Sequence, residues 1–282
     1  MMIIYLNLYV YSLITLLFCK NYDKVLGMKD KGVEKTKDDS EFTPLVRLNK
    51  YISNAGICSR RAADKLIEEG RVKVNKKVVT NLGTKISVDD IVQVDNNLIE
   101  SGDRIYVLMN KPRNVICTRS DENDRKTVLD LLPRKFQHLY PVGRLDRNTT
   151  GVLLLTNDGV LTQNLLHPTK KVKKIYKAKV ANKLTQEELD KMVTGVELED
   201  GVSKFDKIVE LYEDDAFRYG IEIHSGKNRV IRRMFEAINN EVVKLDRVMF
   251  HTFEKRGIAK GGYRELTEKE LKGLEVYLRT KK

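Results

Sequence analysis

The sequence predicts an α+β fold with a mixed, largely antiparallel sheet. Short apolar runs typical of strands alternate with helical stretches through most of the chain. Long parallel strand–helix–strand units and a Gly-x-Gly-x-x-Gly loop, which mark doubly wound parallel folds, are missing from the sequence. We expect three segments, namely an apolar run with a flexible linker at residues 1–45, a small module at residues 46–95 and a larger body at residues 103–275.

The first segment contains an apolar run at residues 1–19, whose length nearly suits a membrane span or the core of a signal peptide. No basic residue precedes the run, and no small-x-small cleavage site stands out after it. The polar stretch Asp30–Glu41 has little that can pack and is typical of a flexible linker. Three interpretations compete: a membrane anchor, a signal, or upstream sequence that is never translated, with Met28 as the true start.

Composition narrows the class of protein. The chain has 282 residues and a formal net charge of +12, from 52 Lys and Arg against 40 Asp and Glu. Its hydrophobic fraction of 41% is enough for a core and excludes a fully disordered chain. Three scattered cysteines without a Cys-x-x-Cys pair exclude a disulfide framework and a cysteine zinc site. The basic excess lies after residue 45 and indicates an anionic partner, either a nucleic acid or a membrane surface.

The module at residues 46–95 has the pattern of two helices followed by short strands. Leu48 and Ile52 share one face of the first helix. Ser59 is a plausible N-cap for the second helix, and Gly70 is placed where a C-terminal glycine would be. The strands expected next cover residues 71–74, 78–79 and 91–94.

The motifs of this module are Arg47-Leu48-x-Lys50, Ala55-Gly56, Ser59-Arg60-Arg61-Ala62-Ala63, Gly70-x-Val72-x-Val74-Asn75 and Gly83-Thr84-Lys85. They resemble the S4 RNA-binding domain. The resemblance implies that the two helices present basic side chains to structured RNA, and cations beside free backbone N–H groups suit phosphates. The residues implied as RNA contacts are Lys50, Arg60, Arg61, Arg71 and Lys73. The alternative is a small basic domain without a ligand.

The body centres on a loop that presents Asp146 between two arginines. The Gly143 turn leads into this loop, and the apolar strand Val152–Leu155 anchors it from behind. From these residues alone, Asp146 is either an ion-paired loop residue or a catalytic carboxylate that nearby guanidinium groups keep ionised. The other elements expected here are strands at 104–109, 151–156, 174–180 and 219–224, and helices at about 185–193, 229–238 and 267–272.

The segment around Asp146 reads Gly143-Arg144-Leu145-Asp146-x-x-Thr149-x-Gly151, followed by an apolar run and Thr156-Asn157-Asp158-Gly159. It resembles the signature of the RsuA/RluB group of pseudouridine synthases, which also carry an N-terminal S4 domain. Two later motifs are similar to those of the group, Lys174–Val180 and Gly226–Glu236, although Val230 stands where many members have Gln. The motifs most similar to the RluB branch, which is named for the large ribosomal subunit, are Lys111-Pro112, Cys117-Thr118-Arg119 and Arg125-x-Thr127-Val128-x-Asp130.

The resemblance implies that a uridine already in RNA is isomerised to pseudouridine, a reaction that needs no cofactor or metal. Asp146 would act as a nucleophile at C1′ or as a base at the 2′ position, and the sequence leaves both open. Tyr176 would stack on the uracil, and Arg232 would pair with Asp146 and keep it ionised. Arg144 would fill the space that the flipped-out base leaves. The further RNA contacts are expected from a nearby basic run, at Lys227 and Arg229.

The expected partner is ribosomal RNA, free or within a pre-ribosomal particle. The RluB-type motifs favour 23S RNA as the target, with 16S RNA as the alternative; a non-catalytic RNA-binding ribosome assembly factor is the second class of function. We expect the site in a cleft across the sheet, lined by the basic runs at residues 170–179 and 227–233. We also expect a cytoplasmic monomer without a membrane anchor, and therefore favour residues 1–27 as upstream sequence that is not translated.

Overall fold

The computed structural model describes residues 45–87, 89–99, 103–119, 121–212 and 216–280. Within these residues the chain divides into two units, residues 45–104 and residues 105–280. The apolar run predicted at residues 1–19 and the linker after it lie outside the described residues. Among the described helices, none is long and apolar enough to cross a membrane.

The smaller unit packs two helices against short antiparallel strands. Ser59 caps the second helix as predicted, because its hydroxyl accepts a hydrogen bond from the Ala62 backbone N–H at 3.2 Å. Leu48 and Ile52 from the first helix are buried in the core of this unit, as their spacing predicted. The helices are α2 (Leu48–Asn54) and α3 (Arg60–Glu68), and the strands are β1 (Val46–Arg47), β2 (Val72–Val74), β3 (Lys77–Val78), β4 (Lys85–Ile86), β5 (Val92–Val94) and β6 (Asn97–Ile99).

Two details of this unit differ from the prediction. The strand expected at residues 91–94 is not the last one, because β6 follows it and pairs with it. Ile91 was expected to belong to that strand, but it lies before β5 with 53% of its surface exposed. The four strands of the main sheet run in the order β3-β2-β5-β6, and all of their pairings are antiparallel.

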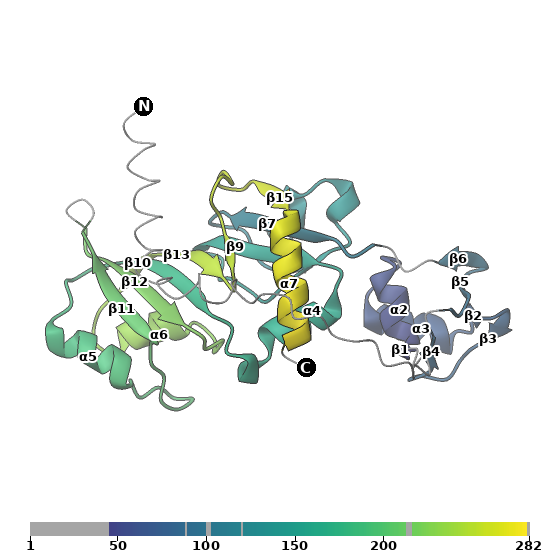
Figure 1. Cartoon of the computed structure of the whole chain (residues 1–282), viewed down its shortest axis with the longest axis horizontal. Coiled ribbons are helices and arrows are strands. Elements are labelled where there is room, and N and C mark those ends of the chain that lie inside the picture. Colours follow the sequence, from purple (N-terminus) through teal and green to yellow (C-terminus); the bar gives the residue numbers. More distant parts are fainter. Residues whose placement is uncertain (1–44, 88, 100–102, 120, 213–215, 281–282) are drawn as a thin grey trace, which may run out of the picture. The chain divides into compact units, whose positions relative to one another are not determined.

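The larger unit is built on one sheet with the strand order β11-β12-β10-β13-β9-β7-β15 (Figure 1). Two short strands pair at its side, β14 with β13 and β8 with β9. Between named strands, only the β9–β13 pairing is parallel among the described residues, which confirms the largely antiparallel α+β prediction. The strands are β7 (Tyr106–Lys111), β8 (Tyr140–Pro141), β9 (Thr149–Thr156), β10 (Lys174–Val180), β11 (Lys207–Leu211), β12 (Arg218–Ile223), β13 (Val242–Phe250), β14 (Phe253–Glu254) and β15 (Tyr263–Glu265).

Helices cover the two halves of this sheet (Figure 1). Over the β10–β12 half, Met234 of one helix packs in a core with Ala178 and Ile221 of the strands. Over the β7–β9 half, Leu161 and Leu274 from two other helices bury a second core. The helices are α4 (Gly159–Leu166), α5 (Gln186–Thr194), α6 (Val230–Glu236) and α7 (Glu268–Thr280), with single 3-10 turns at Leu129–Leu131, Arg134–Phe136 and Pro168–Lys170.

The two halves join where β9 runs parallel to β13. Gly151 on β9 lies opposite Arg247 on β13 and has a φ of +112°, which side-chain-bearing residues rarely adopt. A Cβ atom at Gly151 would lie 2.1 Å from the backbone oxygen of Arg247. Only glycine therefore allows this approach. It brings the loop before β9 beside β13, which is the neighbour of the Tyr176 strand β10.

Candidate active site

Asp146 lies in the loop between β8 and β9. Gly143 opens this loop with a φ of +74°, as the glycine turn predicted. Leu145 anchors it, because its side chain is buried and its backbone N–H points to the sulfur of Cys117 at 3.4 Å. The Asp146 carbonyl accepts a hydrogen bond from the Thr149 N–H at 3.0 Å. The loop backbone is thus fixed, while the Asp146 side chain keeps 33% of its surface exposed.

A fully buried lysine holds the same loop from the end of β7. The Lys111 ammonium donates hydrogen bonds to the carbonyl oxygens of Asp146 at 3.0 Å, Thr149 at 2.9 Å and Arg147 at 3.4 Å. Burial lowers the pKa of this ammonium, while the nearby Cys117 and Asp146 groups oppose that shift. Lys111 therefore fixes the backbone of the loop that presents the Asp146 carboxylate.

The structure brings Arg232 of α6 to Asp146, as the resemblance implied. Its Nε lies 3.8 Å from Asp146 Oδ2, and its side chain is 13% exposed. Its Nη1 donates to the Val242 carbonyl oxygen at 2.7 Å, which fixes the guanidinium. Burial lowers the pKa of Arg232, and Arg229 adds to this shift whereas Asp146 opposes it. Two charged groups therefore face each other at the surface of the sheet without a tight hydrogen bond.

Tyr176 lies on β10 in the middle of the sheet. It is half-buried and packs against two cores, one covered by α6 and the other containing Leu145, the neighbour of Asp146. Across the sheet it pairs with Arg247 on β13. The buried Arg247 donates from Nε to the Val152 carbonyl oxygen at 2.8 Å and stacks over the Phe250 ring at 4.8 Å. Tyr176 thus packs beside the core that contains Leu145 of the Asp146 loop.

Neither Lys111 nor Arg247 was given a role in the predicted site. In the sequence, Lys111 stands out only as part of the Lys111-Pro112 motif. A charged residue that ends an apolar strand is the signal that could have found it, since buried lysines are rare without partners. The same signal applies to Arg247, which precedes the apolar run Val248–Phe250.

The connection from β12 to α6 is fixed by two other lysines. The Lys174 ammonium donates to the His224 carbonyl at 2.7 Å and to the Ser225 carbonyl at 3.3 Å. Burial lowers the pKa of Lys174 to about 8, with Arg247 adding to the shift. The Lys227 ammonium donates to the carbonyl oxygens of Asp200 at 2.8 Å and Gly201 at 3.0 Å. These bonds give Lys227 a structural use, different from the RNA contact that was predicted for it.

The remaining predicted RNA contacts of the body, Arg144 and Arg229, are exposed. Arg144 lies two residues before Asp146, on the side of the loop open to solvent. Arg229 adopts a left-handed backbone conformation just before α6 and lies 3.8 Å from Glu236. Arg144 thus lies near Asp146 and Arg229 lies near Arg232. Both arginines are accessible to a ligand.

In the smaller unit, the five predicted contacts divide into two kinds. Arg60 and Arg61 are exposed in the first turn of α3. The Arg71 guanidinium binds the Asp95 carboxylate with two hydrogen bonds, at 2.7 and 2.6 Å, and Lys73 donates to the Asn96 side chain at 2.7 Å. Lys50 is half-buried on α2. Arg60 and Arg61 are therefore the better placed pair for a phosphate.

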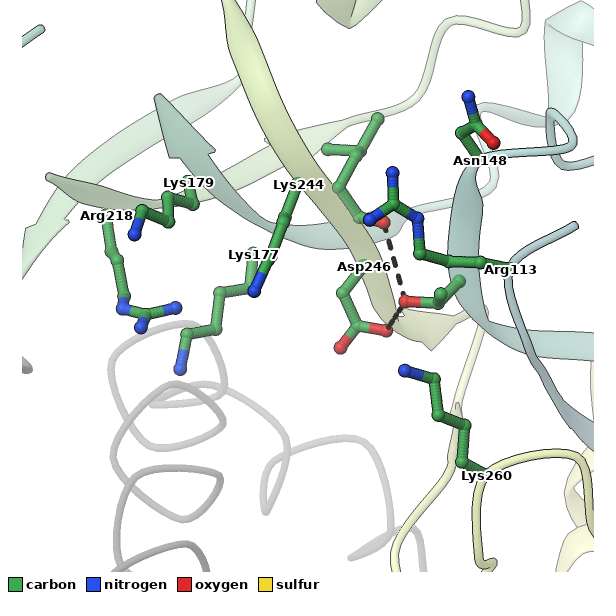
Figure 2. Close-up of a pocket in the computed structure, with 10 residues that line it drawn as sticks. Arg113, Asn148, Lys177, Lys179, Arg218, Lys244, Asp246 and Lys260 are labelled. Carbon is green, nitrogen blue, oxygen red and sulfur yellow. Dashed lines mark hydrogen bonds between the residues drawn. The ribbon is translucent and has the colours of Figure 1, made fainter. Parts of the chain in front are cut away.

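The basic runs do not line a single cleft, which corrects that prediction. Side chains alternate between the two faces of a strand, so Lys177 and Lys179 lie on the opposite face of β10 from Tyr176 and Ala178. On their face lies a pocket, shown in Figure 2. Its lining residues are Arg113, Asn148, Thr150, Lys177, Lys179, Arg218, Lys244, Leu245, Asp246 and Lys260.

Comparison with known proteins agrees with this geometry. Residues 105–237 match the RNA pseudouridylate synthase family, and residues 46–92 match the S4 domain. The ribosomal large subunit pseudouridine synthase B of Bacillus subtilis is 44% identical over 82% of this chain and 96% of its own length. The dual-specificity RNA pseudouridine synthase RluF of Escherichia coli is 37% identical over 80% of this chain and 77% of its own.

A solved structure has a fold similar to that of this chain. A crystal structure of pseudouridylate synthase aligns with a TM-score of 0.58 at 27% identity, covering 81% of this chain and 99% of that chain. The match therefore extends over most of both chains. With an S4 domain followed by this catalytic fold, the chain belongs to the RNA pseudouridine synthase family.

Proposed function

We propose that the protein isomerises a uridine of large-subunit ribosomal RNA to pseudouridine at Asp146. The observation that carries the proposal is the carboxylate itself, which is partly exposed on a loop held by Lys111 and faces the Arg232 guanidinium at 3.8 Å. Two relatives, 44% and 36% identical to this chain, are described as ribosomal large subunit pseudouridine synthase B. The target RNA is inferred from them.

The proposed reaction breaks the N1–C1′ bond of the uridine and forms a C5–C1′ bond after the uracil has rotated. C5 then loses its proton and N1 gains one, so the atoms balance without another reactant. Asp146 acts beside the sugar, as nucleophile at C1′ or as base at the 2′ carbon. Tyr176 supports the uracil ring by stacking, and Arg232 stabilises the carboxylate charge. Arg144 occupies the position of the flipped-out base.

The two units have separate tasks in this proposal. Residues 46–95 bind structured RNA through Arg60 and Arg61, and residues 103–275 carry the chemistry. Phosphate contacts position a protein on RNA without reading its sequence, so the S4 domain supplies affinity and orientation. Ribosomal RNA as the substrate also leads us to propose the cytoplasm as the location.

The test is the release of tritium from C5-labelled uridine in transcribed 23S RNA. The wild type and Asp190→Asn, which changes an exposed carboxylate on α5, are expected to release tritium, and Asp146→Asn is expected to release none. Filter binding of the same RNA should show unchanged affinity for Asp146→Asn, which excludes misfolding. Equal release from Asp146→Asn and the wild type would end the catalytic proposal and favour a non-catalytic assembly factor.

A second measurement identifies the target. Pseudouridines are mapped in both ribosomal RNAs from cells with and without the gene. The proposal expects one or more sites to disappear from 23S RNA and none from 16S RNA. Loss from 16S RNA alone would contradict the large-subunit assignment while leaving the chemistry at Asp146 intact.

A further inference from the structure

The sheet carries a row of three cations on the face opposite Tyr176. Lys179 on β10 pairs directly with Arg218 on β12 and with Lys244 on β13, so the three side chains lie side by side across neighbouring strands (Figure 2). Neighbouring strands lie about 4.8 Å apart, and like charges directly opposite each other destabilise a sheet. This row is therefore costly for folding and suits the binding of a polyanion.

The next row of the same face holds one cation and one acidic residue. Lys177 lies between Gly220 on β12 and Asp246 on β13. Among the described residues that line the pocket, Asp246 is the acidic one, and its carboxylate accepts hydrogen bonds from the Thr150 hydroxyl and the Lys255 ammonium. The Asp246 carboxylate is thus shared with Thr150 and Lys255, and the six cations that line the pocket outnumber it.

The basic face continues to the loop of Asp146. Asn148, which lies two residues after Asp146, lines the pocket, and Arg113 and Lys260 border the same end (Figure 2). Both of these cations are exposed, and neither forms an ion pair with any residue that the structure describes. A strand of phosphates that passes the Asp146 loop could thus meet one basic residue after another on the far face of the sheet.

We propose that this second basic face binds the phosphate backbone of ribosomal RNA outside the modified nucleotide. The residues concerned are Arg113, Lys177, Lys179, Arg218, Lys244 and Lys260, and together they are called the rear basic face. Its role is affinity for large RNA and not chemistry, because the face lies on the other side of β10 from Tyr176. The proposal rests on the proposed function, which supplies RNA as the partner.

The test is the variant Lys179→Gln/Lys244→Gln in the full chain, with Lys269→Gln/Lys272→Gln on the exposed surface of α7 as a control of equal charge. Filter binding to a 23S RNA fragment is measured between about 50 and 300 mM salt, roughly a sixfold range. We expect affinity near 150 mM salt to fall about 10-fold and the slope of log K against log salt to decrease by about 1.5, since each lost phosphate contact removes roughly 0.7 to 0.9. The control should retain wild-type affinity and slope.

Single-turnover tritium release at saturating RNA separates this proposal from the proposed function. The rear-face variant should reach the wild-type rate, and its melting temperature should equal or exceed that of the wild type because like charges are removed. Asp146→Asn should show the opposite pattern, normal affinity without release. Unchanged affinity and slope in the rear-face variant, or an equal loss in the control, would overturn the proposal. Weaker binding to anionic phospholipid vesicles with unchanged RNA affinity would overturn it in favour of a membrane surface.

Discussion

Arg232 and Asp146 face each other at 3.8 Å, yet the Arg232 Nε forms no hydrogen bond with any described residue although it is buried. The same guanidinium is fixed at its other end by the Val242 carbonyl. A buried donor without a partner carries a desolvation cost, so the arrangement is not the best one for stability alone. It leaves the Asp146 side chain 33% exposed and beside a guanidinium, which suits a group that must reach a sugar.

Replacing Arg232 tests this arrangement. Arg232→Lys keeps the charge but lacks the fork that reaches both Val242 and Asp146, and we expect a roughly 100-fold lower single-turnover rate from misplaced geometry. Arg232→Met should lower the single-turnover rate further, because it also removes the charge. Tritium release gives the rate, and filter binding should show unchanged RNA affinity. Full activity of the lysine variant would mean that charge alone matters at this position.

Lys111 offers a test of positioning without any contact to the substrate. Lys111→Met removes the donor for three carbonyl oxygens of the Asp146 loop, and we expect a roughly 100-fold slower single-turnover rate. We also expect the free energy of unfolding to fall by about 1–3 kcal/mol, measured with urea. RNA affinity should not change. A variant that is destabilised but fully active under native conditions would show that Lys111 supports the fold and not the loop geometry.

Much of the fold follows from local patterns in the sequence, and the exceptions share a cause. β10 and the start of α3 were predicted because their periodicity and the Ser59 cap are local signals. β13 was missed because Asp246 and Arg247 interrupt its apolar pattern, and only pairing with β10 and β9 makes the strand. No helix was predicted at α4, where the Asp158 carboxylate accepts hydrogen bonds from the Val160 and Leu161 N–H groups and caps the helix.

The part of the site that belongs to the family motifs was predictable from the sequence. The approach of Arg232 to Asp146 was expected from the family resemblance, and composition alone left Asp146 ambiguous. The use of Lys227 as a brace for the Asp200–Gly201 turn depends on a distant loop, which no local pattern reveals. The opposite orientation of Lys177 and Tyr176, by contrast, follows from strand alternation and was available from the sequence.

The crossing of β9 and β13 predicts a severe effect of a single methyl group. Gly151→Ala places a Cβ 2.1 Å from the Arg247 oxygen at a φ of +112°, and we expect a loss of about 3 kcal/mol or more in the free energy of unfolding. Gly257→Ala is the control, because its φ of +74° is also positive, near the left-handed region, while no atom lies within 4 Å. The control should lose only about 1 kcal/mol. Equal losses in urea unfolding would place the cost in the backbone dihedral and not in the strand contact.

The arginines of the S4 domain differ in whether they already bind a carboxylate of the same domain. Arg60→Gln/Arg61→Gln should weaken RNA binding and reduce the slope of log K against log salt by about 1.5. Arg71→Gln should have a smaller effect, since its guanidinium already binds the Asp95 carboxylate with two hydrogen bonds. Filter binding at several salt concentrations measures both. A larger loss for Arg71→Gln than for the double variant would reverse this assignment.

Lys174 predicts a pH dependence of stability with a definite sign. Burial lowers its pKa to about 8 in the folded protein from 10.5 in the unfolded chain. Between these values the unfolded state binds more protons, so the contribution of Lys174 to the free energy of unfolding increases with pH, by at most about 1.4 kcal/mol per pH unit. Below pH 8 the lysine is charged in both states and this contribution is constant.

The variant Lys174→Met isolates this contribution from other groups that titrate in the same range. Urea unfolding of the wild type and the variant is measured between about pH 7 and 10, a range that includes the folded-state pKa and approaches the unfolded one. The two plots of the free energy of unfolding against pH should diverge above pH 8. The wild type should gain up to about 3 kcal/mol relative to the variant across that range. The absolute offset at pH 7 combines a removed buried charge with two lost hydrogen bonds, to His224 and Ser225, so only the difference in slope is diagnostic. Parallel curves would show that the Lys174 ammonium is not desolvated in solution, and that the segment leading to Arg232 is not held by a buried charge.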